Sequence, residues 1–288
     1  MPTPFRTKDS DLRIACGDFW HAYYTSMLEL HSRQGRSIEQ PLKDRNLGTT
    51  DSKHVSIFER FWRTQLAEAL GVDPMEVGPR RLQFRPHRSK AFDVCWPLTG
   101  EPKILISIKS MQNAYRNFTN RVEEACGDSA VLRLYRLPAV FGFFFFMLDG
   151  KVARGLAEQG KCGPGDVTSG KGKGVAPFLD LIEEGGDFFQ LSHLDEYRKE
   201  AMGKLRGRQN VITFAEKSLI DLLAEEPTKD GDIHYDAIAF VPTSVQRSVP
   251  NPSQSEGWAF DFSKVDDRLD FRPFVDRLVS VAKFRGFI

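Results

Sequence analysis

The longest apolar run of the chain restricts its fold more than any other segment. Nine consecutive residues without a polar side chain, VFGFFFFML, occupy positions 140–148. A strand this apolar has both faces buried, which is typical of the centre of a sheet with parallel neighbours. The run is well short of the ~18 residues needed to cross a bilayer. We therefore expect a central strand of an α/β protein and no membrane span.

Helical and strand-like patterns precede this run in a definite order. Apolar residues at helical spacing are followed by three short segments that turn-forming residues separate. The order is helix, three strands, helix, strand, which predicts a mixed sheet flanked by helices. The predicted elements are helices over 11–32 and 55–70, strands over 81–85, 91–96 and 103–109, and a helix that approaches Tyr135 and ends before Pro138.

These patterns divide the chain into three regions. Residues 1–50 form an N-terminal helical segment, residues 51–150 form the core, and residues 151–288 form a C-terminal α+β elaboration packed on that core. The elements predicted in the last region are helices over 176–184, 194–205, 214–224 and 270–284, and a strand over 235–241.

Composition excludes several classes of protein. With 41% hydrophobic and 27% charged residues the chain is an ordinary globular protein. Its four cysteines form no CxxC or Cys/His pair, so neither a zinc site nor a disulfide framework is indicated. The N-terminus lacks the charged start and apolar core of a secretory signal. We expect a cytoplasmic protein.

Charge is distributed unevenly along the chain. The formal net charge is only +1, from 40 basic and 39 acidic residues. Between Pro79 and Val122, however, nine basic residues stand against two acidic ones, an excess of seven positive charges. A basic block beside an acidic remainder can bind a polyanion through its phosphates without the solubility cost of a strongly charged protein. A solvated surface is the competing explanation of such a cluster.

The third predicted strand carries two polar side chains on one face. Isoleucines at positions 104, 106 and 108 alternate with Ser107 and Lys109, so the serine and the lysine share the face opposite the isoleucines. In the second strand the same alternation puts Phe92 and Val94 together and leaves Asp93 on the other face.

The turn between these strands brings the three polar residues together. Asp93 and Ser107 are each seven residues from Gly100. A symmetric antiparallel hairpin therefore places Asp93 across from Ser107, with Lys109 one same-face position further on. A carboxylate suits a hard divalent cation, and a neighbouring ammonium can orient a water or stabilise charge on a phosphate. Solvated charges on a half-exposed strand are the alternative explanation of Asp93 and Lys109.

This constellation resembles a known family. Asp93, a hairpin and then Ser107-Ile108-Lys109 resemble the Asp…(Asp/Glu)-x-Lys signature of the PD-(D/E)xK nucleases, which include many type II restriction endonucleases. The element order from about Ser52 to Leu148 resembles their core. The resemblance implies a restriction-endonuclease-like α/β fold, Mg²⁺ as cofactor, and sequence-specific hydrolysis of double-stranded DNA to 5′-phosphate and 3′-hydroxyl ends. It implies that Asp93 binds the metal with help from the Ile108 carbonyl, while Lys109 positions the attacking water.

Ser107 departs from the signature, because it replaces the second acid. The chain resembles a branch of restriction enzymes in which this position is serine and a glutamate from the next helix, about fourteen residues past the lysine, takes over as metal ligand. Glu123 lies fourteen residues after Lys109. Glu124 would point about 100° away on a helix and ranks second. Glu59 matches an additional carboxylate that some members of the family carry. The resemblance leaves Ser107 to tune the site without binding the metal.

The resemblance also implies partners. Symmetric cutting of both strands calls for two sites related by a twofold axis, so we expect a homodimer on double-stranded DNA. The C-terminal region would contact DNA or form the dimer. A hydrated helix face explains the polar part of the basic block equally well, and Glu123 could simply pair with a neighbouring arginine. The candidate DNA contacts, which are residue types that bind phosphates or base edges, are Arg80, Arg81, Arg85, Arg88, Asn113, Arg116, Asn117, Asn120 and Arg121.

Two alternatives belong to other functional classes. One is a non-catalytic DNA-binding protein of the same fold that lost the acid at Ser107. The other is a nucleotide-binding protein, because residues 165–172 come within one residue of the phosphate-binding loop GxxxxGK(S/T). Gly172 lacks the hydroxyl that would bind magnesium, and no buried strand precedes the loop. We favour a flexible basic loop over 163–174 that touches the DNA backbone, and its role stays open.

Overall fold

The computed structural model describes most of the predicted core and the end of the chain. The helices predicted over 176–184 and 194–205, the loop 163–174 and the phosphate-loop-like motif 165–172 lie outside the described residues. The described residues are 4–33, 35, 54–85, 88–111, 118–134, 137–148, 211–223, 235–247 and 258–288.

A six-stranded mixed sheet forms the centre of the protein, and its strands follow one another in sequence order. The first three strands and the last pair are antiparallel, whereas the three central strands are parallel. The fold is therefore α/β with a mixed sheet flanked by helices, as predicted. The strands are β1 (Gly78–Arg85), β2 (Arg88–Trp96), β3 (Ile104–Met111), β4 (Val140–Leu148), β5 (Ala237–Arg247) and β6 (Trp258–Phe262).

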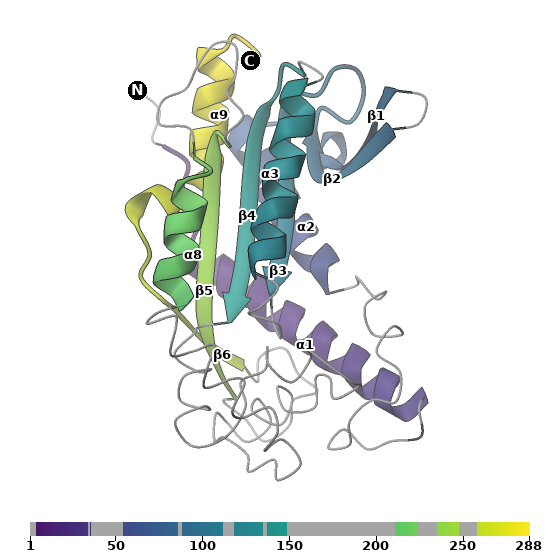
Figure 1. Ribbon diagram of the computed structural model, residues 1–288, viewed down its shortest axis with the longest axis vertical. Coiled ribbons are helices and arrows are strands. Elements are labelled where there is room, and N and C mark those ends of the chain that lie inside the picture. The colour runs from purple at the N-terminus through teal and green to yellow at the C-terminus, as the bar shows by residue number, and fades with distance from the viewer. Residues whose placement is uncertain are drawn as a thin grey trace.

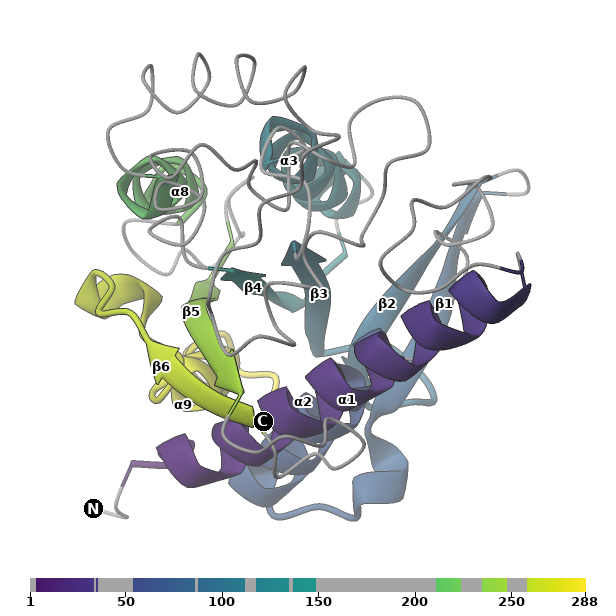
Figure 2. The ribbon, with the colours of Figure 1, turned by 90° about the horizontal axis from the view of Figure 1, so that it is seen from below.

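Helices cover both faces of this sheet. In Figure 2 α3 and α8 lie on one face, and α1, α2 and α9 lie on the other. α3 connects β3 to β4, and α8 precedes β5. The two connections between parallel strands thus place their helices on the same face, as expected when both crossovers have the same handedness. The α-helices are α1 (Asp9–Arg33), α2 (Val55–Leu70), α3 (Phe118–Leu134), α8 (Val211–Ile220) and α9 (Phe274–Phe284), with short 3-10 helices η2 (Pro74–Glu76) and η6 (Asp267–Leu269).

The apolar run of β4 is buried from both sides, which confirms the prediction made from its sequence. Phe144 contacts the rings of Phe58 and Trp62 on α2, with centroids 5.1 Å away in each case. Phe143 faces the other layer, where its ring lies 5.2 Å from that of Tyr235. Both neighbours of β4 are parallel to it, also as predicted. In Figure 1 this strand lies in the middle of the ribbon.

The sequence predicted most element positions but missed some boundaries. The helix predicted over 55–70 is confirmed, and Gly71 ends it in the left-handed region at a φ of 68°. The last helix begins at Phe274 rather than at position 270, because residues 267–269 form η6 and Pro273 precedes the helix. The edge strand β6 was not predicted.

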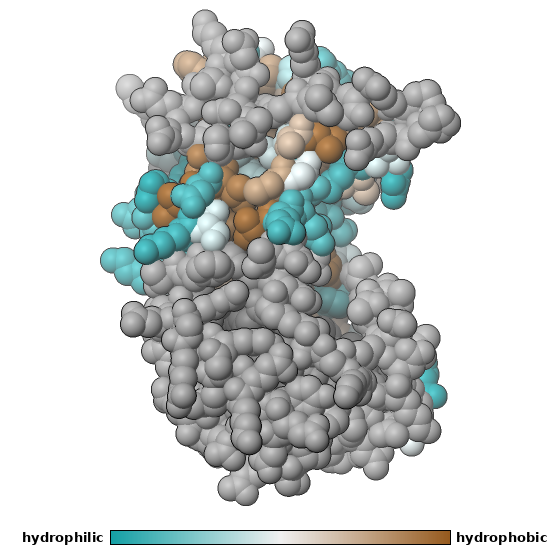
Figure 3. Space-filling model, in the orientation of Figure 1, coloured by the Kyte–Doolittle hydropathy of each residue, from teal (hydrophilic) through white to brown (hydrophobic). Residues whose placement is uncertain are grey.

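The surface on the α3 and α8 side is part apolar. Figure 3 shows hydrophobic atoms in a band between flanks of hydrophilic ones, within the part of this face that is coloured. No helix in the described ranges is both long enough and apolar enough to cross a membrane.

Candidate functional site

The site forms where β2 and β3 separate. β2 pairs with β3 through Val94↔Ile106 and the two pairs that follow towards the turn. This register is symmetric about Gly100, so the predicted hairpin is confirmed for its closing pairs. From Ser107 onward, the ladder of β3 is with β4 on its other side. Figure 2 shows the β1–β2 ribbon turning away from β3, and within the described ranges no ladder pair joins β2 to β3 beyond Ile106.

A β-bulge in β2 directs Asp93 towards the point where the two strands separate. Gly78 pairs with Cys95, whereas Arg80, two residues later, pairs with Phe92, so β2 holds one residue more than β1 across this interval. A bulge re-aims a side chain and increases the local twist of the strand. The predicted alternation, with Phe92 and Val94 on one face, is wrong here because it assumed a regular strand.

The contacts of Phe92 and Val94 show that these two residues face opposite sides of the sheet. The Phe92 ring lies 5.7 Å from that of Phe141, whose register partner is Leu105. Val94 instead pairs with Ile106, the next residue of β3, which points to the opposite face. Asp93 lies between these two orientations and extends sideways towards the edge of β3.

The Asp93 carboxylate binds the backbone of β3 directly. Its Oδ2 accepts the backbone N–H of Ile108 at 2.6 Å. Burial raises the pKa of Asp93, and the charge of Asp128 adds to this; the Ile108 N–H and the ammonium groups of Lys109 and Lys90 act in the opposite direction. Burial thus favours the protonated form of Asp93, and a cation bound beside it would favour the carboxylate instead.

Glu59 on α2 belongs to the same electrostatic environment. Burial raises its pKa, and the second cause is the negative charge of Asp93. Glu59 is the additional carboxylate that the resemblance implies, and it lies within the influence of the Asp93 charge.

Lys109 pairs with Glu124 rather than with Glu123. Its Nζ lies 3.7 Å from Glu124 Oε2, and the two side chains are 25% and 47% exposed. Glu123 is exposed, and its charge acts on Cys126 one turn further along α3. Ser107 is buried, at 3% exposure.

The structure adds two residues that the sequence did not place in the site. Lys90 of β2 donates to Asp128 Oδ1 on α3. Both charges act on the pKa of Asp93. From the sequence, Lys90 is one more base of the basic block, and Asp128 belongs to no motif. A signal existed, because Asp128 lies four residues after Glu124 and thus on the same side of the helix.

The candidate DNA contacts are only partly described. Arg80 donates to the carbonyl of Pro97 at 3.2 Å, and so points to the end of the hairpin. Arg81 is exposed and bonds Ser89 Oγ at 3.1 Å. Residues 113, 116 and 117 lie outside the described residues, as do the side chains of residues 85, 88, 120 and 121, although Asn120 and Arg121 are part of α3.

The donors fit Mg²⁺ bound with substrate better than a closed metal cage. Within the described ranges no three or more His, Cys, Asp or Glu side chains gather closely enough to hold a metal ion. Proteins commonly hold Mg²⁺ through one or two carboxylates, with waters and substrate phosphates completing the octahedron. Asp93 at the edge of β3 and Glu59 on α2, whose pKa the Asp93 charge raises, provide such an incomplete set.

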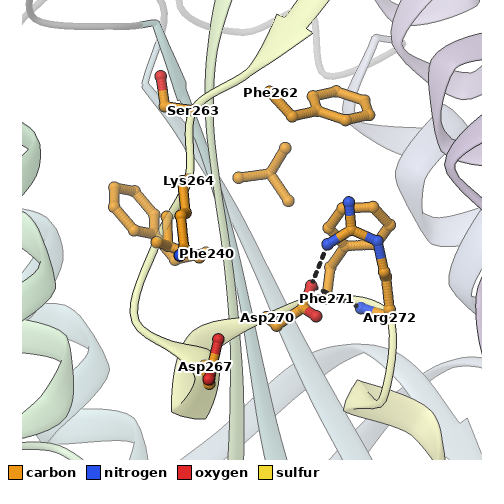
Figure 4. A pocket seen from close by; sticks show the side chains of 10 residues that line it. Phe240, Phe262, Ser263, Lys264, Asp267, Asp270, Phe271 and Arg272 are labelled. Atoms are coloured by element: carbon orange, nitrogen blue, oxygen red, sulfur yellow. Dashed lines mark hydrogen bonds and ion pairs between the residues drawn. The ribbon is translucent and has the colours of Figure 1, made fainter.

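A separate cavity of about 210 Å³ lies between β5, β6 and the segment 263–272. Figure 4 shows the rings of Phe262 and Phe271 on its sides, with the Asp270–Arg272 pair near its base. None of the predicted site residues lines it.

Comparison with known proteins adds no assignment: no family model matches this chain, and neither a curated protein nor a solved structure matches it.

Proposed function

We propose that this protein is a Mg²⁺-dependent endonuclease that cuts double-stranded DNA at specific sequences, in the manner of the type II restriction enzymes that its sequence resembles. The observation that carries the proposal is the position of Asp93. The bulge in β2 aims its carboxylate at the edge of β3, where it accepts the N–H of Ile108, one residue before Lys109.

The element order supports the same proposal. α2, the three strands β1 to β3, α3 and β4 follow each other in the order that the PD-(D/E)xK core has. β2 and β3 form the hairpin that the signature requires. Asp93 lies on β2, and Lys109 lies on β3 beyond the last residue that pairs with β2. A restriction-endonuclease-like core is therefore the fold that we propose for this region.

Each side chain has a role in this mechanism. Asp93 would hold the Mg²⁺, with the Ile108 carbonyl as a further ligand and Glu59 as the nearby second charge. The metal, when bound, would acidify a water and neutralise charge on the phosphate. Lys109 would orient the attacking water, and its pair with Glu124 holds the ammonium in place beforehand. The expected ends are a 5′-phosphate and a 3′-hydroxyl.

DNA and a second copy of the chain are the proposed partners. The excess of basic residues between Pro79 and Val122 would bind the backbone, and exposed Arg81 is the described side chain best placed for it. Cutting both strands at one site calls for two active sites, so the proposed active species is a homodimer.

Cleavage of mixed-sequence DNA tests the proposal. Unmethylated DNA is incubated with the full chain and Mg²⁺ or a chelator, and the ends are mapped by sequencing. We expect discrete ends, at one recurring sequence, in Mg²⁺ alone. Asp93→Asn, which keeps an acceptor for the Ile108 N–H, should bind DNA without cutting it. DNA left intact by the wild type with Mg²⁺ and with Mn²⁺ would refute the nuclease.

A buried serine favours a second candidate function. Ser107 stands where the signature has an acid and is 3% exposed. A non-catalytic DNA-binding protein of this fold could have lost the acid there. Sequence-specific binding that is equally tight with and without Mg²⁺, without cleavage, would support this candidate over the nuclease.

A further inference from the structure

Two acid–lysine pairs connect α3 to β2, the strand that holds the Asp93 bulge, and to its neighbour β3. Glu124 pairs with Lys109 of β3, and Asp128, four residues later, pairs with Lys90 of β2. The pairs differ in their surroundings. The Glu124 side chain is 47% exposed, whereas that of Asp128 is 11% exposed. Water therefore screens the first pair, and the second lies in a medium where an uncompensated charge costs far more.

Asp128 has an oxygen without a hydrogen-bond partner. The residue is 8% exposed, and Oδ1 accepts from Lys90. Its Oδ2 is fully buried and receives no hydrogen bond from the described residues. A buried acceptor left unsatisfied costs about 1 to 3 kcal/mol, and more when it is charged. Such an oxygen requires a donor or a cation.

The Lys90 ammonium lies in the field of two carboxylates. It bonds to Asp128 and lowers the pKa of Asp93, while the Asp128 charge raises it. Glu59 adds a further negative charge that is itself influenced by Asp93. Lys90 thus contacts Asp128 directly and acts on Asp93 through its charge, whereas a divalent cation brings twice the charge of an ammonium and prefers oxygen ligands.

We propose that Asp128 is the acid that completes a divalent-cation site with Asp93, and that Lys90 competes with the cation for Asp128. The inference rests on the proposed function, because it names the second acid of the same site in place of the acid missing at Ser107. Lys90 holds the buried Asp128 carboxylate when no cation is bound, and a cation that binds displaces it.

The two partners of the Lys90–Asp128 pair have opposite effects on metal affinity. Asp128→Asn removes a ligand and should weaken binding by about tenfold or more. Lys90→Met removes the competing positive charge and should tighten binding. A pair that only stabilises the fold predicts no such opposition, since loss of either partner would then leave metal affinity unchanged or lower it in both variants.

A calorimetric titration of the full chain with Mn²⁺, in the absence of DNA, tests these opposite effects. The matched control is Glu101→Gln, which removes a carboxylate that pairs with a lysine at the other end of the same hairpin, 3.0 Å from Lys103 Nζ. Its Mn²⁺ affinity should equal that of the wild type. Wild-type affinity in Asp128→Asn, weaker binding in Lys90→Met, or no Mn²⁺ binding by the wild type would each overturn the inference. If Asp128→Asn does not fold, the Mn²⁺ affinity of Lys90→Met alone tests the inference: a higher affinity than that of the wild type supports it, and an equal or lower affinity overturns it.

DNA cleavage separates this inference from the proposed function. Mn²⁺ binding that depends on Asp128 in a protein that cuts no DNA would uphold the metal site and refute the nuclease. Cleavage by the wild type together with undiminished cleavage and Mn²⁺ binding by Asp128→Asn would refute the role of Asp128 and leave the nuclease standing.

Discussion

Arg285 and Asp236 form an ion pair whose side chains are 3% and 1% exposed. Arg285 follows α9 directly, and Asp236 precedes β5. Arg285 Nη1 donates to Asp236 Oδ2 at 3.0 Å, and the same oxygen accepts the backbone N–H of Phe141 at 2.7 Å. The pair thereby connects the segment after α9 to the first residues of β4 and to the residue before β5, two of the three parallel strands.

Asp236→Ala should destabilise the protein strongly. The variant leaves a buried guanidinium without its counter-charge, which typically costs about 3 to 5 kcal/mol. Urea unfolding measures the loss. Glu29→Ala, which removes an exposed pair with Arg33 on α1, is the control and should cost ~0.5 kcal/mol or less. Equal losses in the two variants would contradict the importance of the buried pair.

Lys109 should be required for turnover but not for metal binding. Lys109→Ala loses the ammonium that orients the water, so cleavage should fall by about 100-fold or more while Mn²⁺ affinity changes little. Lys109→Arg should not restore cleavage, because a planar guanidinium cannot replace a compact ammonium. Single-turnover cleavage rates test both variants. An active arginine variant would show that Lys109 is only a phosphate contact.

Glu123 and Asp128 should differ in their effect on cleavage. The resemblance implies that Glu123 is the relocated acid, so that its loss would be as harmful as loss of Asp93. In the structure the α3 acid whose charge acts on Asp93 is Asp128, and Glu123 is exposed. We therefore expect Glu123→Gln to cut DNA at near the wild-type rate and Asp128→Asn to be inactive. An inactive but folded Glu123→Gln would show that Glu123, as the resemblance implies, is the second metal ligand.

Asp93→Asn should stabilise the metal-free protein at neutral pH. Burial raises the pKa of Asp93 above its ordinary value of 3.8, so the folded state favours the protonated form. The stability that this proton provides is fully present below pH 3.8 and is lost as the pH rises through the folded-state pKa. In chelator at pH 7 the variant should melt on the order of 2 °C higher than the wild type. Melting curves taken at falling pH should converge; a lower Tm for the variant at pH 7 would contradict the sign.

The hairpin was predictable because its determinants are local. The turn around Gly100 sets the register of Val94 with Ile106, and the alternation of apolar and polar residues sets the faces of β3. The central position of β4 likewise follows from its own sequence, because an entirely apolar strand needs cover on both faces.

The parts that failed depend on pairing between distant segments. The bulge at Asp93 arises from the ladder with β1, and nothing in the residues around Asp93 marks it. The helical angle separates Glu123 from Glu124, but which of them faces the strands depends on how α3 packs. β6 is only five residues long and acquires its strand structure by pairing with β5.

Any side chain at Gly142, the single glycine in the apolar run of β4, should lower the stability of the protein. A Cβ there would lie 2.9 Å from Leu278 Cδ1 and 3.0 Å from Phe274 Cζ, both on α9. Both side chains are fully buried, so they must repack within the core to make room for the new methyl group. Gly142→Ala should therefore cost about 1 to 3 kcal/mol, the usual cost of overpacking. In a double-mutant cycle with Leu278→Ala, the space freed by leucine should accept the new methyl group, so the combined loss should be smaller than the sum of the single losses. Strictly additive losses in urea unfolding would show that α9 does not approach β4 as closely as the structure places it.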